Sequence, residues 1–330
     1  MSMISEDIMG FFTGKRCLVT GGTGMIGRFV VDKLVSYGAD VTSISLDNIQ
    51  PNSSVKYLNA DLSDFGLCLE ITKDMDCVFH VAGIKGSVEV TKSKPASFLV
   101  PLLQMNTNII EASRQSGIQH FVYTSTIGTY PSAEVFVEEE YDPSSQPMDH
   151  YPGWAKRMAE MQIETYNIQY GLTNYSIVRP CNVYGPGDSF KPESAMVIPT
   201  LLMRIINKEN PVMVWGDGRA IRDFAYAEDV AEGIILALYH GTQGSFVNLG
   251  SGTGVTIKEL LDTIQLVTDF TYEFDLDKPS GFKRRIMNID RAKDWIGYSP
   301  QFSLEDGLRK TWSWLNENVT EHKHRKNYFN

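Results

Sequence analysis

The sequence lacks the features of a membrane-embedded or secreted protein. No apolar run approaches the ~20 residues that a helix needs to cross a bilayer. The first residues, MSMISEDIMGFF, place no basic segment before an apolar core, so they are not a secretory signal. The four cysteines form no CxxC pair and are typical of small core residues in a reducing compartment: Cys17, Cys68, Cys77 and Cys181. We therefore expect a cytoplasmic protein with no membrane partner.

Basic residues are also scarce relative to acidic ones. The 330 residues contain 30 Lys and Arg against 40 Asp and Glu, which gives a net charge of -10 and a pI of about 5.1. An acidic surface argues against nucleic acid as the main partner. A local cluster of arginines or a helix N-terminus can still bind a phosphorylated ligand on such a protein. We predict neither a nucleic-acid partner nor a metal site.

Strand and helix patterns alternate through the first half of the chain. Helical patterns at 27–37, 101–116 and 152–170 separate short apolar segments that are typical of buried strands. These segments occupy residues 16–20, 40–46, 56–59, 77–81, 121–125 and 175–179. Such alternation indicates a doubly wound α/β fold, in which helices cover both faces of a parallel sheet.

The alternation of strand and helix patterns becomes less regular after Tyr184. Short strand patterns then mix with helical ones, at 212–215 and 245–249 for strands and at 198–208, 227–239, 257–267 and 304–316 for helices. We predict a dinucleotide-binding domain over residues 1–185 and a smaller mixed α/β substrate domain over 186–330. A segment near 212–250 is expected to return to the main sheet, and the charged tail EHKHRKNYFN to fray.

A glycine-rich turn follows the first predicted strand and precedes a helix. Its sequence is TGGTGMIG, in which Gly21 makes a tight turn, Gly24 lets backbone N–H groups approach a pyrophosphate, and Gly27 allows close helix–strand packing. Met25 and Ile26 open the helix and belong to the same cradle. This arrangement predicts a Rossmann-type site for a dinucleotide.

Residues at the ends of the next strands are predicted to complete this site. Asp47 lies 20 residues after Gly27, where an acidic group bonds the adenosine ribose and repels a 2′-phosphate, which favours NAD. Ser45 is an equally plausible strand end and is neutral, so NADP stays open. Asp61 and Leu62 are expected near the adenine, and Ala82 near the cofactor.

The GxxGxxG spacing and several later motifs resemble the extended short-chain dehydrogenases that act on nucleotide sugars, the NAD-dependent epimerase/dehydratase family. The resemblance covers nearly the whole chain. The further matching motifs are Asp61-Leu62, HVAG at 80–83, YTST at 123–126, RPCNVYGP at 179–186, and GDG at 216–218 with RDF at 222–224.

The resemblance implies a catalytic Ser/Thr, Tyr and Lys. Thr126 and Lys156 match the family positions, and Lys156 would also hold the nicotinamide ribose. The residue four before the lysine is Pro152, whereas Tyr151 is five before and lies ~100° off the expected helix face. Because proline suits a first helical turn, Tyr151 is expected just outside the helix, from where it can reach the site. The alternatives are a site that relies on Thr126, His150 or water, and a Tyr151 that only packs.

The resemblance is strongest to GDP-fucose synthase-like proteins, in which a Cys and a His serve 3,5-epimerisation. Here Ile127-Gly128 and Met196 stand at the corresponding places, so we predict no such epimerisation. The Asp-Glu pair of the 4,6-dehydratases and the Glu of the decarboxylases are missing at the same two positions. Hydride transfer at C4 of a GDP-hexose or GDP-heptose remains, by a dehydrogenase, a ketoreductase or a 4-epimerase, in the supply of polysaccharide precursors.

The resemblance also implies residues that bind the nucleotide sugar. Arg222 and Arg285 match clamps of the diphosphate, since bidentate arginines suit phosphate geometry. Asn182 and Val197 are expected to contact the substrate. Family members form homodimers through a four-helix bundle, for which the candidate helices are 101–116 and 152–170. A non-catalytic NAD-binding regulator is the competing hypothesis.

Overall fold

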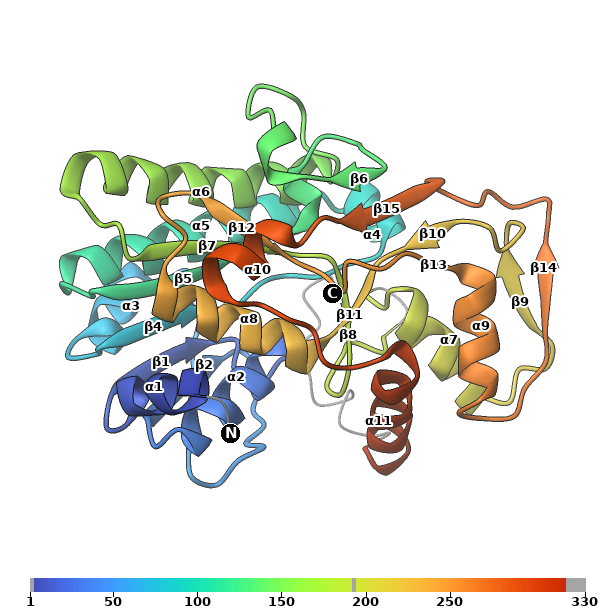
Figure 1. Cartoon of the computed structure of the whole chain (residues 1–330), viewed down its shortest axis with the longest axis horizontal. Helices are drawn as coiled ribbons and strands as arrows, with labels where there is room; N and C mark the ends of the chain where they lie inside the picture. Colours follow the sequence, from blue (N-terminus) through green and yellow to red (C-terminus); the bar gives the residue numbers. More distant parts are fainter. Residues whose placement is uncertain (1–2, 192–193, 319–330) are drawn as a thin grey trace.

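A seven-stranded parallel sheet forms the centre of the protein (Figure 1). The computed structural model describes residues 3–191 and 194–318. The strand order is β12-β7-β5-β4-β1-β2-β3, and each neighbouring pair is parallel. The bounds are β1 Arg16–Thr20, β2 Asp40–Ser45, β3 Lys56–Asn59, β4 Cys77–His80, β5 His120–Thr124, β7 Tyr175–Pro180 and β12 Phe246–Leu249. The predicted doubly wound fold is confirmed.

The strands are apolar on both faces because helices cover both sides of the sheet. In β1, Cys17 and Val19 pack into one hydrophobic cluster while Leu18 between them packs into another, as the period of two requires. The first cluster lies under α1 (Met3–Phe12), α2 (Met25–Ser36), α8 (Ala227–His240) and α10 (Asp290–Ile296). The second lies under α3 (Phe65–Thr72), α5 (Ala96–Gln115) and α6 (His150–Tyr170). All four cysteines are buried and free, as predicted.

Helix α5 begins earlier than the sequence pattern predicts. The prediction placed its start at Pro101, a residue that favours a first turn, but the helix runs from Ala96 and contains Pro101 inside it. Phe98 and Leu102 are both buried, so tertiary packing holds the extra turn despite the missing proline N–H. Because Phe98 lines the main cavity, this extra turn contributes to the functional site.

The remaining elements build a smaller mixed α/β region beside the sheet, at the right of Figure 1. One four-stranded sheet has the order β13-β10-β15-β6, and two two-stranded sheets pair β11 with β8 and β14 with β9. The strands are β6 Val135–Phe136, β8 Asn182–Tyr184, β9 Val212–Trp215, β10 Ile221–Arg222, β11 Phe224–Tyr226, β13 Val255–Thr256, β14 Tyr272–Asp275 and β15 Arg284–Met287. The helices are α4 Val88–Ser93, α7 Val197–Ile206, α9 Ile257–Gln265 and α11 Leu304–Glu317, with short 3-10 turns η1 Ile127–Thr129 and η2 Glu138–Glu140.

The segment 212–250 returns to the large sheet only at its end. Strand β12 joins the edge of that sheet beside β7, whereas β9 pairs with β14. The physical reason is visible in β9, where Val212 and Val214 are buried while Met213 and Trp215 are exposed. A strand with only one buried face does not fit a sheet that is covered on both sides.

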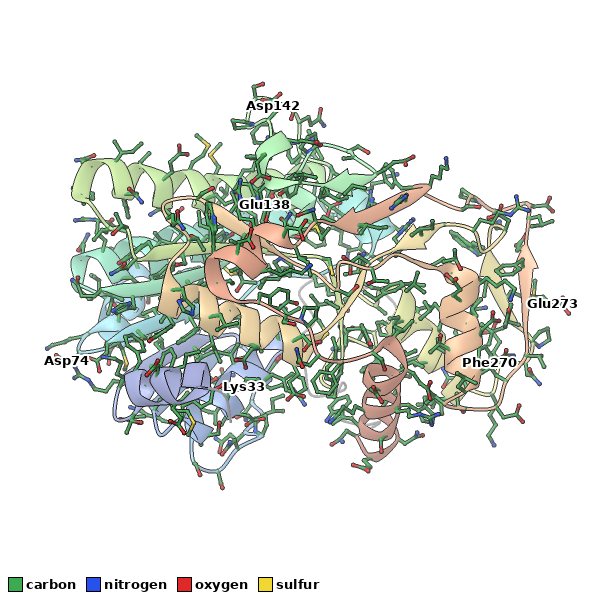
Figure 2. The ribbon with its side chains drawn as sticks, in the orientation of Figure 1. Lys33, Asp74, Glu138, Asp142, Phe270 and Glu273 are labelled. Atoms are coloured by element: carbon green, nitrogen blue, oxygen red, sulfur yellow. The ribbon has the colours of Figure 1, made fainter. Side chains whose placement is uncertain are left out.

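Asn248 joins the two parts of the molecule. Its side chain accepts a 3.0 Å hydrogen bond from the Tyr130 hydroxyl and donates 3.1 Å bonds to the carbonyl oxygens of Phe136 and Asn288. Its backbone N–H donates to the Glu138 carboxylate at 2.8 Å. Figure 2 shows Glu138 among the central elements and Asp142 on an outer loop. The predicted frayed tail lies outside the described residues. None of the described helices is long and apolar enough to cross a membrane.

Candidate active site

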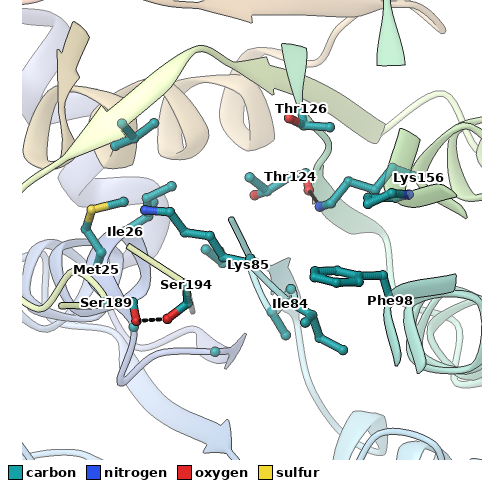
Figure 3. A pocket seen from close by; sticks show the side chains of 18 of the residues that line it. Met25, Ile26, Ile84, Lys85, Phe98, Thr124, Thr126, Lys156, Ser189 and Ser194 are labelled. Atoms are coloured by element: carbon teal, nitrogen blue, oxygen red, sulfur yellow. Dashed lines mark hydrogen bonds between the residues drawn. The ribbon is translucent and has the colours of Figure 1, made fainter. Parts of the chain in front are cut away.

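A cavity of about 660 Å³ opens at the carboxyl ends of the central strands. Its walls come from the segments that follow β1, β2, β4, β5 and β7, together with the start of α6. This edge of a doubly wound sheet is where such folds bind their ligands. Figure 3 shows Met25, Ile26, Phe98, Thr126 and Lys156 around the cavity. The predicted cofactor residues all line it: Gly21, Gly24, Met25, Ile26, Asp47, Asp61, Leu62, Ala82 and Lys156.

The glycine turn leaves no room for side chains. Gly21 has a φ of +70°, and a Cβ there would lie 2.8 Å from the Ala82 Cα. A Cβ on Gly27 would collide with the Gly21 carbonyl oxygen. Gly24 is the N-cap of α2 and provides no side-chain cap, so the first N–H groups of the helix are left for a ligand. The turn is therefore built as an anion cradle at the positive end of a helix.

A small polar cluster follows β2 at the next part of the cavity. The Thr23 and Ser45 hydroxyls lie 2.7 Å apart, and the Ser45 Oγ accepts a 3.1 Å bond from the Asp47 N–H. Thr23 also donates to the Asp47 carboxylate at 3.4 Å. Strand β2 ends at Ser45, yet both Ser45 and Asp47 line the cavity, so the acidic group is present at the predicted place.

Lys156 on α6 lines the cavity. Its Nζ donates a 2.7 Å hydrogen bond to the carbonyl oxygen of Thr124, at the end of β5 (Figure 3). The Nζ also lies 5.2 Å from the centroid of the Tyr123 ring. Burial lowers the pKa of Lys156 to about 8 because a charged ammonium is poorly solvated there. The lysine can therefore change its charge near neutral pH.

Thr126 and Tyr151 both line the same cavity. The Thr126 Oγ1 caps the η1 turn by accepting a 3.2 Å bond from the Gly128 N–H. Tyr151, 38% exposed, lies inside the first turn of α6 and not outside the helix as expected. The reason is that Asp149 serves as the N-cap, with its carbonyl oxygen accepting a 2.5 Å bond from the Gly153 N–H. Tyr151 and Lys156 therefore lie on one continuous helix, with Tyr151 five residues before the lysine instead of four.

Comparisons with known proteins agree with this geometry. Residues 17–250 match the NAD dependent epimerase/dehydratase family. The chain belongs to this family. GDP-L-fucose synthase 1 of Arabidopsis thaliana is 29% identical over 313 residues, which cover 92% of this chain and 94% of that protein. The prediction of an enzyme from a family that uses NAD is confirmed.

Two solved structures extend the comparison. An epimerase from Methanothermobacter thermautotrophicus has a TM-score of 0.85 at 24% identity, with 97% of this chain and 98% of that chain covered, which is a likeness of fold. A UDP-glucose 4-epimerase from Thermotoga maritima, solved with UDP-glucose, has a TM-score of 0.79 at 28% identity, covering 92% of this chain and 99% of that one. The Rossmann-type fold of the family is thus confirmed over nearly the full length.

The four residues expected to bind the substrate do not all line the same cavity. Asn182 and Arg285 line the cavity, whereas Val197 lines a small pocket beside it that also contains Asn182. Arg222 does not line either pocket. Its Nη1 donates 2.7 Å bonds to the carbonyl oxygens of Ile221 and Phe282, which directs the guanidinium toward backbone. Arg222 is the register partner of Arg285 on the paired strands β10 and β15, so it lies beside Arg285 although it does not line the cavity.

Sequence reasoning missed an ion pair in the cavity wall. The Lys85 Nζ lies 2.7 Å from the Asp188 Oδ1, and these residues come from the segments after β4 and after β8. The Asp188 side chain is only 2% exposed, and its Oδ1 also accepts a 2.6 Å bond from the Ser189 N–H. The two residues are far apart in the sequence, so no local pattern signals their pairing.

The sequence analysis also missed Asp149 as a cavity residue. Asp149 lines the cavity at an exposed position, and partial desolvation raises its pKa while the charge of Arg285 opposes that rise. The one available signal was the position of an Asp before a helical pattern, which is typical of an N-cap. Its side chain, however, makes no capping bond.

Proposed function

We propose that this chain is an NAD-dependent oxidoreductase that transfers hydride at C4 of a nucleotide-linked sugar, with a GDP-hexose or GDP-heptose favoured. One observation carries the proposal: a single cavity contains the glycine cradle, Lys156 and Arg285. The glycine cradle suits the dinucleotide, Lys156 suits the reacting sugar, and Arg285 suits the diphosphate. The proposed reaction needs all three in one cavity. The GDP preference is supported by the curated relatives, several of which are GDP-L-fucose synthases.

The residues present fit NAD. The uncapped start of α2 and the crowded glycines suit a pyrophosphate, and the Asp47 carboxylate suits a ribose without a 2′-phosphate. When bound, NAD supplies a hydride acceptor at its nicotinamide ring. Lys156 would hold the adjoining ribose, and the Thr126 hydroxyl would bond the reacting sugar oxygen. Tyr151 is the proposed acid/base for the sugar hydroxyl, from the neighbouring turn of the helix.

Arg285 suits the diphosphate of the substrate. Its guanidinium carbon lies 3.7 Å from the centroid of the Phe282 ring, and burial lowers its pKa to about 10. Its Nε is buried and makes no hydrogen bond to another described residue. A partly buried cation with a buried, unused donor is stabilised by an anion with matching oxygens. Asn182 is the neutral donor proposed on the same side of the cavity.

A 4-epimerase is the second candidate. The observation that favours it is the 28% identity and full-length likeness to the Thermotoga maritima UDP-glucose 4-epimerase. An epimerase returns the hydride to the same carbon and makes no net NADH, whereas a dehydrogenase or ketoreductase changes the cofactor with each turnover.

The test is turnover of a panel of GDP-, UDP- and dTDP-hexoses and GDP-heptoses by the NAD-loaded protein. We expect one sugar to give NADH absorbance or, for an epimerase, a C4-inverted product detected by NMR. Lys156→Met should abolish either signal while the fold is retained. If the wild type binds the cofactor but leaves every sugar unchanged with NAD, and every matching 4-keto sugar unchanged with NADH, the regulator hypothesis replaces the enzyme.

We also propose a homodimer formed by α5 and α6, which pack against each other on one face of the sheet (Figure 1). The support is an exposed apolar surface on α6, where Met158 is 46% exposed, Met161 50% and Ile168 78%. Met161→Glu should convert the dimer to a monomer in light scattering. Leu276→Glu is the matched control, since Leu276 is 74% exposed on another part of the molecule.

A further inference from the structure

Asp149 is an acidic group in the cavity that the proposed hydride transfer does not use. It is the N-cap of α6, but its side chain makes no capping bond, although Asp is among the best N-cap residues. The backbone holds it firmly, with its N–H donating to the Gly128 carbonyl oxygen at 3.1 Å and its carbonyl accepting from Gly153. The carboxylate is therefore positioned by the main chain and left open toward the cavity.

Gly128 makes the space that this carboxylate occupies. A Cβ on residue 128 would collide with the Asp149 Oδ2 and would also lie 2.8 Å from its Cγ. The sequence prediction excluded proton transfer at this point because Ile127 and Gly128 carry no acidic or basic group. That exclusion considered only the side chains of residues 127 and 128. The fold brings a carboxyl group from another segment into the space of the missing side chain.

Asp149 lines the same cavity as Lys156 and Arg285, the residues assigned to the two ends of the proposed substrate. Lys156, which marks the hydride end, is seven residues further along, roughly 10 Å of helix rise away and on nearly the same face. Arg285, which marks the diphosphate end, is close enough that its charge lowers the pKa of Asp149 against the effect of desolvation. Thr126 lies two residues from Gly128, and its Oγ1 accepts the Gly128 N–H. A sugar between these groups would present its ring to the carboxylate.

We propose that Asp149 is a further catalytic residue, which removes and returns a proton on a ring carbon next to C4 while C4 is a ketone. This rests on the proposed oxidation at C4, which supplies the ketone and needs no other oxidant. The C–H electron pair moves toward the C4 carbonyl to give an enolate, and the proton moves to the Asp149 carboxylate. Return of a proton from the carboxyl group to carbon restores the ketone, so that atoms and charge balance.

Two features suit Asp149 to this step. A proton next to a carbonyl is acidic enough for a carboxylate base that is held in place and partly desolvated. Partial desolvation raises the pKa of Asp149 above its ordinary value, which makes its carboxylate a stronger base. The activity that follows is exchange of a ring proton with solvent, and inversion of that carbon wherever the proton returns to the opposite face.

The experiment is solvent exchange in D₂O. The NAD-loaded wild type is incubated with the sugar that it turns over, and deuterium at each ring carbon is measured by NMR and mass spectrometry. We expect deuterium at C3 or C5. Asp149→Asn, which keeps the size of the side chain, should lower this exchange by about 100-fold or more relative to the rate of C4 hydride transfer measured in the same sample. Gly128→Ala should lower exchange in the same way, because its Cβ displaces the carboxylate.

Asp142→Asn is the matched control, since Asp142 is exposed and forms its hydrogen bonds with Ser144 in an outer loop. It should leave exchange unchanged. Hydride transfer by the wild type without ring deuterium overturns the role of Asp149 alone. Exchange that persists in Asp149→Asn also overturns it. Absence of any turnover by the wild type overturns the proposed function, and the role of Asp149 with it.

Discussion

Arg179 and Glu160 form a two-pronged ion pair beneath the active site. The Arg179 Nε and Nη2 donate to the two Glu160 carboxylate oxygens at 2.9 and 2.6 Å, and the two side chains are 0% and 9% exposed. The guanidinium carbon also lies 3.6 Å from the centroid of the Phe246 ring. The same carboxylate accepts the hydroxyl of Ser125, the residue before Thr126. This pair therefore fixes the end of β5, from which the segment with Thr126 starts.

We expect Glu160→Gln to destabilise the protein by about 3–5 kcal/mol, because it leaves Arg179 charged and buried without its counter-ion. Urea unfolding of the NAD-free protein measures the change. The matched control is Glu305→Gln on α11, where the partner Arg309 lies at 2.7 Å but both side chains are exposed. That surface pair should contribute at most about 1 kcal/mol. Equal losses in the two variants would contradict the argument.

Gly27→Ala should weaken NAD binding and destabilise the protein by about 1–3 kcal/mol, since the added Cβ forces the Gly21 carbonyl out of the turn. Fluorescence titration with NADH and urea unfolding report the two effects. Gly10→Ala in α1 is the control, because a Cβ there meets nothing within 4 Å. It should stabilise the helix by roughly 0.5–1 kcal/mol. A Gly27→Ala protein that binds NADH as the wild type does would exclude the proposed cradle.

Asp47→Ala should reduce the preference for NADH over NADPH. The variant loses a charged hydrogen-bond acceptor for the ribose, worth about 1.5–3 kcal/mol, and also the charge that repels a 2′-phosphate. NADH should therefore bind roughly 10-fold or more weaker, while NADPH binds as well or better. Asp40→Ala at the far end of β2 is the control, and both dissociation constants should stay unchanged there. Undiminished discrimination in Asp47→Ala would assign the choice of cofactor to other residues.

The local part of this site could be predicted from sequence. The glycine turn, Lys156 and the strand ends follow from spacing, because each lies within one β-α unit whose geometry the chain determines locally. Gly128 and Asp149, in contrast, come into contact only when the chain folds. No sequence pattern at either position indicates that the two residues will be neighbours. The same holds for Lys85 with Asp188. The return of β12 to the large sheet was predicted, but β9 was misplaced there, because an apolar run does not indicate which sheet will receive it.

The pH dependence of the free energy of unfolding should reflect the shifted pKa of Lys156. Its pKa falls from 10.5 when unfolded to about 8 when folded, so the unfolded chain binds more protons between these values. The cost of burying the charged lysine is therefore full below pH 8 and disappears as the pH rises toward 10.5. Relative to wild type, Lys156→Met should gain most stability at pH 7, and this gain should shrink between pH 8 and 10.5.

Urea unfolding of both proteins across this range measures the difference. Lys258→Met is the control, since the Asp262 carboxylate beside this exposed lysine raises its pKa instead of lowering it. It should give no gain at pH 7. A difference between wild type and Lys156→Met that is constant with pH would mean that Lys156 titrates at its ordinary value.

The space shared by Gly128 and Asp149 also constrains how this protein and its relatives can evolve. Any side chain at position 128 excludes the carboxylate of residue 149 from its present place. Mutations at the two sites are therefore not independent: a lineage that acquires a side chain at 128 loses the use of an acid at 149, and one that loses the acid is free to fill the gap. Relatives with a side chain at position 128 should accordingly lack an acid at position 149.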